Sequence, residues 1–307
     1  MKILISDKIQ EEGIKILQDS GFEIVKNYSI SYEDLKKEIE KFEAIIIRSR
    51  TRLTTEVLEN AKNLKAIGRA GVGLDNVDLK KAKELGIEVF NTPEAPSISV
   101  AELTIGLILS LVRHISRADE TLHCGEWLKS NYVGYVLKGK KIGLIGFGNI
   151  GQEVAKRCAA LEMIIGIYDV DKNIKEKARE LGFTVYPSVD ELIQDVQIIS
   201  LHMPATVDTE NTIDERRLNL MNENTLIINT ARGSLIEETA LIKALKNKKI
   251  GGAALDVYRE EPLKNKELCD INENLILTPH IGSQTKETQI QASIMIAEKI
   301  SDFLKNL

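Results

Sequence analysis

Three side chains with complementary chemistry follow consecutive strand-like segments in the second half of the chain. Arg232 follows TLIINTA, Glu261 comes a short turn after GGAALDV, and His280 ends LILTPH. In a parallel sheet the carboxyl ends of the strands meet at one edge, and ligands bind there. A guanidinium can grip a carboxylate as a rigid fork, and an imidazole can take up a hydroxyl proton and return it. A carboxylate on the other ring nitrogen fixes the tautomer, so this set suits hydride transfer to or from a 2-hydroxy acid.

Each of these residues also has an ordinary interpretation. An arginine after a strand is usually a solvated loop residue, a glutamate before Pro262 can simply shape a turn, and a lone histidine is often structural. Their position at consecutive strand ends beside a dinucleotide loop favours the chemical interpretation. Of the other histidines, His114 and His123 lie in a helical region, whereas His202 ends a strand and is expected to line the cofactor site.

The dinucleotide loop is KKIGLIGFGNIG at residues 140–151, a pattern typical of a buried strand, a G-x-G-x-x-G turn and the start of a helix. Gly146 allows the tight turn, Gly148 lets a pyrophosphate approach the backbone, and Gly151 lets helix and strand pack closely. A second strand, MIIGIY, ends in Asp169, where a carboxylate accepts the ribose hydroxyls of NAD and repels the 2′-phosphate of NADP. The glycines alone indicate only a tight turn, but the full order of elements predicts NAD binding.

Further polar residues lie inside strands or at strand ends. Asp256 belongs to the buried strand segment ALDV, where a charge needs a partner, either a polar contact at the nicotinamide end or a structural ion pair. Arg48 and Arg69 follow EAIII and LKAI, and residues 68–73 form a second glycine-rich strand exit. An ordinary loop explains that exit, because no acid-tipped strand completes a second dinucleotide site. The two arginines can instead hold a phosphate or carboxylate.

The elements that position these groups alternate between strand and helix. The first part of the chain alternates strand segments with helices expected at residues 8–20, 31–42, 54–61 and 77–85. Pro93 and Pro96 then form a stiff joint, which predicts a domain boundary. One long helix is expected at residues 97–116, further strands and helices follow the glycine loop, and residues 286–307 are expected to form the last helix. Such βα units predict parallel sheets covered by helices.

Composition excludes several classes of function. The 307 residues are 43% hydrophobic and 28% charged, which is typical of a globular protein of about two domains. The net charge of −5 is spread along the chain, so neither a nucleic-acid nor a membrane surface is expected. Three separated cysteines without a C-x-x-C pair argue against zinc or a disulfide framework. No signal peptide or membrane-spanning run is recognisable, so a cytoplasmic location is expected.

GFGNIG, NTARGSLIEE, ALDVYREEP and TPHIGS occur here in a familiar order and spacing. With them the chain resembles the D-isomer-specific 2-hydroxyacid dehydrogenases over essentially its whole length. The resemblance implies an α/β fold with two doubly wound parallel sheets. These are a Rossmann-type NAD-binding domain at residues 95–283 and a flavodoxin-like substrate domain at residues 1–94 and 284–307, with a cleft between them. It also implies a homodimer through the NAD-binding domain, and the short chain is expected to lack a regulatory domain and serine inhibition.

The resemblance assigns roles to individual residues. Arg232, Glu261 and His280 are implied to be catalytic, with His280 as the acid/base assisted by Glu261. The residues implied to contact NAD are Gly146, Gly148, Asn149, Ile150, Gly151, Asp169, Met203, Pro204, Thr230, Ala231 and Asp256. Those implied to hold the substrate are Arg48, Arg69 and Gly71, and no metal is implied.

The segments IGRAGVGLDNVD and NTPEAPSISVAELT resemble those of family members that act on a phosphorylated substrate. The expected activity is NAD-dependent oxidation of D-3-phosphoglycerate to 3-phosphohydroxypyruvate, the first step of the phosphorylated route to serine. A sibling enzyme that acts on glyoxylate, hydroxypyruvate or the keto acid of D-lactate is the alternative, since the same three residues would serve it. An NAD-sensing binding protein is a more distant alternative, because such proteins can keep these residues.

Overall fold

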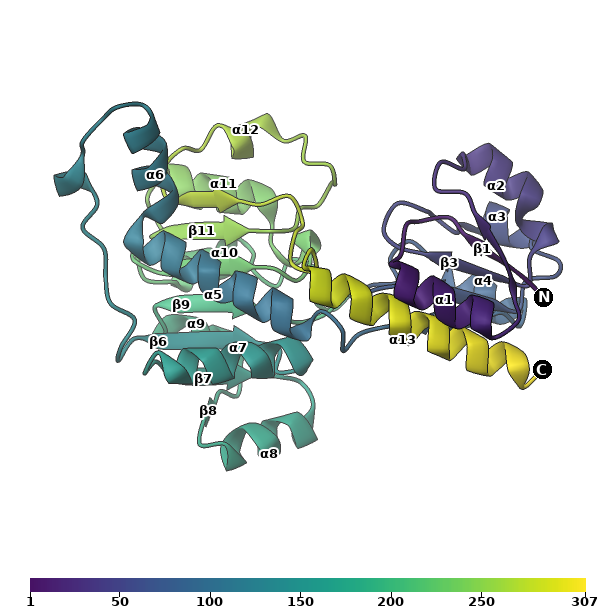
Figure 1. Ribbon diagram of the computed structural model, residues 1–307. Coiled ribbons are helices and arrows are strands. Elements are labelled where there is room, and N and C mark those ends of the chain that lie inside the picture. The colour runs from purple at the N-terminus through teal and green to yellow at the C-terminus, as the bar shows by residue number, and fades with distance from the viewer. The chain divides into compact units, whose positions relative to one another are not determined.

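The computed structural model describes residues 1–307, which form two compact units, each built on its own parallel sheet (Figure 1). Unit 1 consists of Met1–Pro96 and Ser283–Leu307, and unit 2 of Ser97–Gly282. The first unit is therefore discontinuous in sequence, because the last helix of the chain belongs to it. The expected α/β fold with two parallel sheets is confirmed.

Unit 1 is organised around a five-stranded sheet in the order β2-β1-β3-β4-β5. Its strands are β1 (Lys2–Ile5), β2 (Glu23–Lys26), β3 (Ala44–Ile47), β4 (Ala66–Arg69) and β5 (Glu88–Asn91). The central strand β3, with the sequence AIII, is fully buried, as a parallel strand covered on both faces must be. The direction of winding reverses between β1 and β3, and ligands of such sheets bind at the carboxyl ends beside this point.

Helices cover both faces of the unit 1 sheet. The helices α1 (Glu11–Asp19) and α13 (Lys286–Lys305) pack side by side on one face around a core that includes Ile14 and Ile296 (Figure 1). The short helices α2 (Tyr32–Glu38), α3 (Thr55–Glu59) and α4 (Leu79–Glu84), with the 3₁₀ turn η1 (Ile39–Lys41), form the other core. The amide of Gln10 donates to the hydroxyl of Ser293 at 2.9 Å, which ties α13 to the start of α1.

Unit 2 contains a seven-stranded parallel sheet in the order β12-β11-β10-β9-β6-β7-β8. Its strands are β6 (Lys141–Ile145), β7 (Ile164–Tyr168), β8 (Thr184–Val185), β9 (Ile198–Leu201), β10 (Leu226–Asn229), β11 (Gly252–Leu255) and β12 (Leu275–Leu277). The six strands from β6 to β11 follow the doubly wound order of dinucleotide-binding sheets, and β12 adds a seventh strand at one edge. The winding reverses between β6 and β9, so the carboxyl ends near these strands are the expected binding edge.

Two helical layers cover the unit 2 sheet. One contains α5 (Ser97–Arg113), α7 (Asn149–Ala160) and α8 (Lys172–Glu180), and the other α9 (Val189–Asp195), α10 (Glu215–Leu220) and α11 (Glu238–Lys246). The remaining elements are α6 (Ile115–His123), α12 (Lys266–Cys269) and the 3₁₀ turns η2 (Lys129–Asn131) and η3 (Gly233–Leu235). Ser188 caps α9: its hydroxyl accepts the amide of Glu191 at 3.2 Å and donates to the Glu191 carboxylate at 3.1 Å.

The single helix expected at residues 97–116 is wrong. The chain breaks at His114, which has a left-handed φ of 54° that cannot continue a right-handed helix, so α5 ends at Arg113 and α6 begins at Ile115. No single helix is long and apolar enough to cross a membrane; α5 and α6 pass that test only as a pair, with a bend of 66° between them.

Candidate active site

The glycine loop joins the central strand β6 to α7 in a tight turn. Gly146 has a φ of +96°, and a Cβ there would lie 2.6 Å from the carbonyl oxygen of His202 on the neighbouring strand exit. A Cβ on Gly151 would lie 2.5 Å from the carbonyl oxygen of Gly146. Nothing lies within 4 Å of a Cβ on Gly148, so the backbone there faces open space. The three glycines therefore meet the three stereochemical demands of a phosphate loop.

The N-terminus of α7 is open to an anionic ligand. Its N-cap residue, Gly148, provides no side-chain hydrogen bond, and Asn149, Ile150 and Gly151 form the first turn. The first amides of a helix have no partner within the helix, and the helix dipole adds partial positive charge. These donors and the open space at Gly148 fit a pyrophosphate.

Asp169 stands beside this loop at the end of β7. Its Oδ2 accepts the amide of Phe147 at 2.7 Å, and its Oδ1 accepts the amide of Asp171 at 3.0 Å. The carboxylate thus supports the glycine loop, while each oxygen keeps a second lone pair for another donor. An acceptor beside the anion-binding amides fits the ribose of a dinucleotide.

The exit of β9 carries His202, followed by Met203 and Pro204. The ring Nε2 of His202 lies 2.8 Å from the hydroxyl of Ser200, and its Nδ1 is buried without a hydrogen-bond partner. Burial lowers the pKa of His202 to about 3, so its ring is neutral at physiological pH. The backbone of His202 lies against Gly146 of the loop, and its neutral ring carries no charge that could bind phosphate.

Thr230 and Ala231 follow β10. The hydroxyl of Thr104 donates to the carbonyl of Val100 at 2.8 Å and therefore accepts the hydroxyl of Thr230, whose oxygen is 3.0 Å away. This buried bond joins β10 to α5. The amide of Ala231 donates to Oδ1 of Asn229 at 3.1 Å, which shapes the turn into the next residue.

The three residues selected for chemistry come together in unit 2. Nδ1 of His280 lies 2.7 Å from Oε2 of Glu261, and the amide of Tyr258 donates to Oε1 of Glu261 at 3.1 Å. Burial alone would raise the pKa of Glu261, but the hydrogen bond and charge of His280, the Tyr258 amide and the positive charge of Arg232 together lower it. Glu261 is therefore an ionised acceptor at neutral pH, with His280 bonded to it and Arg232 close by.

Arg232 is positioned by the last residue of β10. Asn229, which is buried, donates from Nδ2 to the carbonyl of Arg232 at 2.8 Å. The guanidinium itself donates from Nη1 to the carbonyl of Ala231 at 2.7 Å. The side chain therefore leaves a turn whose backbone is fixed on both sides.

Within the protein, the buried carboxylate of Asp256 is bonded to three neutral donors. Its carboxylate accepts the hydroxyl of Thr278 at 2.6 Å and the amides of Ile281 and Gly282, each at 2.8 Å. The alternative of a structural ion pair is not found, because three neutral donors from the exit of β12 satisfy this buried charge. These donors surround His280, which has a left-handed φ of 53°. Asp256 therefore fixes the turn that carries the histidine.

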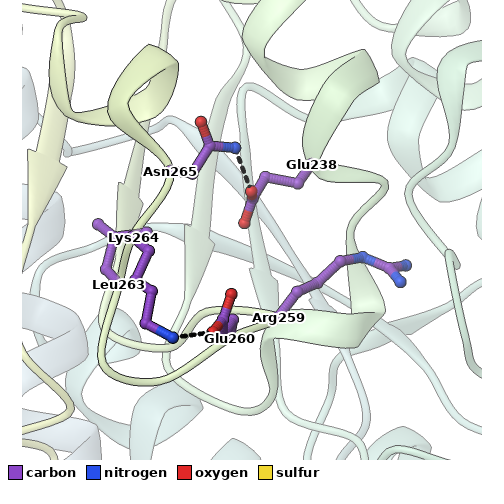
Figure 2. A pocket seen from close by; sticks show the side chains of 6 residues that line it. All are labelled: Glu238, Arg259, Glu260, Leu263, Lys264 and Asn265. Carbon is purple, nitrogen blue, oxygen red and sulfur yellow. Dashed lines mark hydrogen bonds and ion pairs between the residues drawn. The ribbon is translucent and has the colours of Figure 1, made fainter.

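The segment around Glu261 also lines a surface pocket of about 340 Å³ (Figure 2). Its lining residues are Glu238, Arg259, Glu260, Leu263, Lys264 and Asn265. Figure 2 shows Asn265 bonded to Glu238 and Lys264 paired with Glu260, and Arg259 contacts Glu210 at 3.3 Å. None of the three residues selected for chemistry lines this pocket. Its polar contacts instead anchor the loop that carries Glu261, which precedes Pro262 in a cis peptide.

In unit 1, sequence reasoning missed a central acid. Asp7 is 4% exposed and accepts the amide of Arg48 at 2.6 Å, the amide and hydroxyl of Thr51 at 3.1 and 2.9 Å, and Nε of Arg50 at 3.0 Å. Burial lowers the pKa of the Arg48 guanidinium, and the charge of Asp7 opposes this. Asp7 directly follows the KILIS strand, so the strand-end rule that selected the other residues could have found it.

Arg69 and Gly71 lie together at the end of β4. A Cβ on Gly71, which has a φ of +145°, would lie 1.5 Å from Nη1 of Arg69. The guanidinium therefore rests against the α-carbon of the glycine, and any side chain there would displace it. Arg48 follows β3, the strand next to β4, so the two arginines leave adjacent strands at the same edge of the unit 1 sheet.

Comparison with known proteins agrees with this geometry. Residues 105–282 match the family D-isomer specific 2-hydroxyacid dehydrogenase, NAD binding domain. The chain is 44% identical to a D-3-phosphoglycerate dehydrogenase of Methanocaldococcus jannaschii over 99% of its length, but it spans only 58% of that relative. It is 40% identical to a hydroxypyruvate reductase of Thermotoga maritima, with 97% of both chains covered.

A solved structure shows the same fold. The apo-structure of D-lactate dehydrogenase from Escherichia coli superposes with a TM-score of 0.85 and 30% identity, covering 100% of this chain and 98% of the other.

The chain spans little more than half the length of the D-3-phosphoglycerate dehydrogenases of Methanocaldococcus jannaschii and Archaeoglobus fulgidus. The family match, the glycine loop and the parallel sheet lead to one conclusion. The chain belongs to the D-isomer specific 2-hydroxyacid dehydrogenases, and its second unit carries their NAD-binding domain.

Proposed function

We propose that the protein oxidises D-3-phosphoglycerate to 3-phosphohydroxypyruvate with NAD as the hydride acceptor. The observation that carries this proposal is the 2.7 Å hydrogen bond between His280 and Glu261, with Arg232 close to the same carboxylate. This set lies at the carboxyl edge of the sheet whose central turn meets the demands of a phosphate loop. A proton acceptor, its orienting carboxylate and a guanidinium are the groups that oxidation of a 2-hydroxy acid needs.

His280 is the proposed acid/base. Because the carboxylate of Glu261 is ionised and only accepts hydrogen bonds, Nδ1 of His280 must carry the proton of their shared bond. The lone pair is then on Nε2, which takes the hydroxyl proton during oxidation and returns it during reduction. Arg232 holds the carboxylate of the substrate through its planar fork.

The cofactor residues are proposed as a group. The amides of Asn149, Ile150 and Gly151 bind the pyrophosphate, with Gly148 leaving the approach open, and Asp169 accepts the ribose hydroxyls. The turns that carry Met203, Pro204, Thr230, Ala231 and Asp256 lie at the same carboxyl edge and line the nicotinamide half. NAD, when bound, supplies the hydride acceptor; every proton transfer is assigned to His280.

Arg48 and Arg69 of unit 1 are the proposed phosphate ligands. The positive charge of Arg48 is disfavoured by burial, so a phosphate would restore favourable electrostatics there. The names of the relatives in Methanocaldococcus jannaschii and Archaeoglobus fulgidus also support a phosphorylated substrate. Replacing Arg48 or Arg69 with Gln should raise KM for 3-phosphohydroxypyruvate at least about tenfold and change KM for hydroxypyruvate much less. Arg52→Gln is the control, because Arg52 is exposed in the same loop.

The second candidate function is reduction of hydroxypyruvate without a phosphate. It is favoured by one observation, the match over 97% of both chains to the Thermotoga maritima relative named for this activity. Equal effects of Arg48→Gln on phosphorylated and unphosphorylated substrates would support it.

A steady-state assay of NADH oxidation tests the proposal. It compares 3-phosphohydroxypyruvate, hydroxypyruvate, glyoxylate and pyruvate, with His280→Gln as the variant that lacks the base. A large kcat/KM preference for the phosphorylated keto acid, lost in the variant, is the expected result. A preference for an unphosphorylated keto acid would retain the mechanism and replace the substrate. Binding of NADH without turnover of any of the four would instead favour an NAD-sensing binding protein.

The protein is further proposed to form a homodimer through unit 2. Exposed apolar side chains gather in α6 and the segment after it, where Ile115, Leu122, Trp127, Val133 and Val136 are 53 to 79% exposed. An apolar surface of this kind is costly in water and suits a second copy of the chain. Light scattering should give twice the mass of 34.3 kDa for the wild type and a monomer for a variant with serine at residues 127, 133 and 136. Replacement of the exposed Val207 is the matched control.

A further inference from the structure

Tyr258 lies between the segments that carry the three proposed catalytic residues. It follows β11 and is 8% exposed. Its hydroxyl donates to the carbonyl of Thr278 at 2.8 Å and contacts the carbonyl of Leu255 at 3.1 Å. A hydroxyl has one hydrogen, so this is a three-centre bond that spans the exits of two adjacent strands, β11 and β12.

The carbonyl of Thr278 also accepts the amide of His280 at 3.0 Å. The phenol therefore contacts the turn that presents the histidine, at the place where the backbone takes its left-handed φ of 53°. A non-glycine residue holds this conformation only when surrounding contacts determine it. The Tyr258 hydroxyl is one of those contacts.

The backbone of Tyr258 contacts Glu261 and the turn that carries Arg232. Its amide donates to Oε1 of Glu261 at 3.1 Å, and the other oxygen of this carboxylate accepts Nδ1 of His280. A Cβ on Gly233, the neighbour of Arg232, would lie 2.0 Å from the carbonyl carbon of Tyr258, so the arginine turn rests directly on this residue. These bonds form a closed circuit. The amide of Tyr258 binds Glu261, Glu261 binds the ring of His280, and the amide of His280 binds the carbonyl of Thr278, which also accepts the hydroxyl of Tyr258.

We propose that Tyr258 is a positioning residue whose buried hydroxyl sets the register between the His280 turn and the Glu261 carboxylate. The proposal rests on the acid/base role given above to this pair. Burial and the nearby charge of Asp256 raise the pKa of Tyr258, so the phenol remains a donor throughout the working range. Its loss would leave the histidine and the glutamate in place but less constrained relative to each other.

The test is Tyr258→Phe, which removes only the hydroxyl. No carbonyl loses all its donors, because Leu255 keeps the amide of Thr278 and Thr278 keeps the amide of His280, so the variant should fold. The expected change is a fall in kcat of about tenfold, a fraction of the hundredfold or more contributed by general acid–base catalysis. KM for the keto acid and Kd for NADH should stay within about twofold, since neither ligand is proposed to contact the phenol.

A second readout is independent of turnover. The Nδ1 proton of His280, in a short bond to a carboxylate, should give a far-downfield ¹H NMR signal that is absent in His280→Gln. In Tyr258→Phe this signal should shift and broaden. Tyr186→Phe is the matched control: it also removes a hydroxyl bonded within unit 2, to Asp195, but beside β8 at the opposite edge of the sheet.

Wild-type kcat together with an unchanged signal in Tyr258→Phe would overturn the proposal. So would an equal fall in kcat in both tyrosine variants, because that would indicate only a general loss of stability. Failure of the proposed function is distinguishable from both outcomes. The wild type would then reduce none of the keto acids, while the NMR signal would still report whether Tyr258 holds the pair.

Discussion

Gly146→Ala should damage both the stability of unit 2 and its affinity for NADH. An alanine would have to keep a φ of +96°, which costs an L-residue about 1–2 kcal/mol. Its Cβ would also lie 2.6 Å from the carbonyl oxygen of His202 and 2.9 Å from the amide nitrogen of Met203. Both contacts are with backbone of the adjacent strand exit, which cannot rotate away, and such overpacking adds about 1–3 kcal/mol.

These terms together predict a loss of about 2–5 kcal/mol in the free energy of unfolding. For a domain of the size of unit 2, 1 kcal/mol corresponds to about 2–4 °C, so Tm should fall by roughly 4–20 °C. The displaced turn would also misdirect the first amides of α7. Kd for NADH, measured by fluorescence titration below the new Tm, should therefore rise by about tenfold or more.

Gly148→Ala is the matched control, and it separates the two effects. Gly148 has a φ of −70°, and nothing lies within 4 Å of a Cβ there, so Tm should stay within a few degrees of the wild type. The methyl group would nevertheless occupy the space assigned to the pyrophosphate, and Kd for NADH should rise as strongly as in Gly146→Ala. Wild-type Tm in Gly146→Ala, or wild-type NADH affinity in Gly148→Ala, would refute the reasoning.

Three further predictions follow from perturbed groups in unit 2. Burial raises the pKa of Cys158 to about 12, so a thiol reagent at mildly alkaline pH should modify the two exposed cysteines in the folded protein and this one only after unfolding. Two arginines of α10 bind Asp190 and hold its pKa well below the usual range, so Asp190→Asn should cost about 1 kcal/mol at neutral pH. That difference should shrink as pH falls below the ordinary aspartate pKa, in urea titrations at several pH values. Burial keeps His202 neutral, with a pKa of about 3 against an ordinary 6.5. The free energy of unfolding should therefore fall by up to about 1.4 kcal/mol for each pH unit below pH 6.5, and His202→Asn should reduce this slope.

The glycine loop and the convergence of the three proposed catalytic residues could be predicted from sequence because their signals are local. Gly146, Gly148 and Gly151 stand at fixed spacing between a strand and a helix, and the turn has one stereochemical solution. Arg232 and His280 each follow a strand directly, and parallel strands place their carboxyl ends at one edge. The residues therefore converge even though they are far apart in the chain.

Interactions between distant segments could not be predicted in the same way. The alternatives for Asp256 were a nicotinamide contact or an ion pair, but its partners come from the loop after β12. Their identity depends on the register of β11 against β12, which residue pattern does not specify. The break at His114 was missed for a similar reason, since an apolar run continues across it and only the backbone conformation ends α5.

One arrangement of an acid and backbone amides recurs at three strand exits. It involves Asp7, which the sequence reasoning missed, as well as Asp169 and Asp256, which it selected. A carboxylate at the end of one strand accepts backbone amides from the loop that leaves the adjacent strand. Asp7 after β1 binds the amide of Arg48 after β3, Asp169 after β7 binds that of Phe147 after β6, and Asp256 after β11 binds two amides after β12. Each bond to a charged acceptor contributes about 1.5–3 kcal/mol.

These acids therefore shape the loops that carry the proposed ligand-binding groups, whether or not they also contact a ligand. Substituting Asp169 or Asp256 with Ala would remove a loop anchor together with any ligand contact, and a weaker affinity for NADH would not identify which was lost. Asn keeps one acceptor oxygen for the backbone amides but loses the charge. Because both oxygens of each carboxylate accept protein donors, Asn restores only part of the loop anchor, and the Tm of the Asn and Ala variants must be measured beside Kd for NADH to separate support of the loop from recognition of the cofactor. The distinction matters most at Asp256, where all three observed donors hold the turn that presents His280.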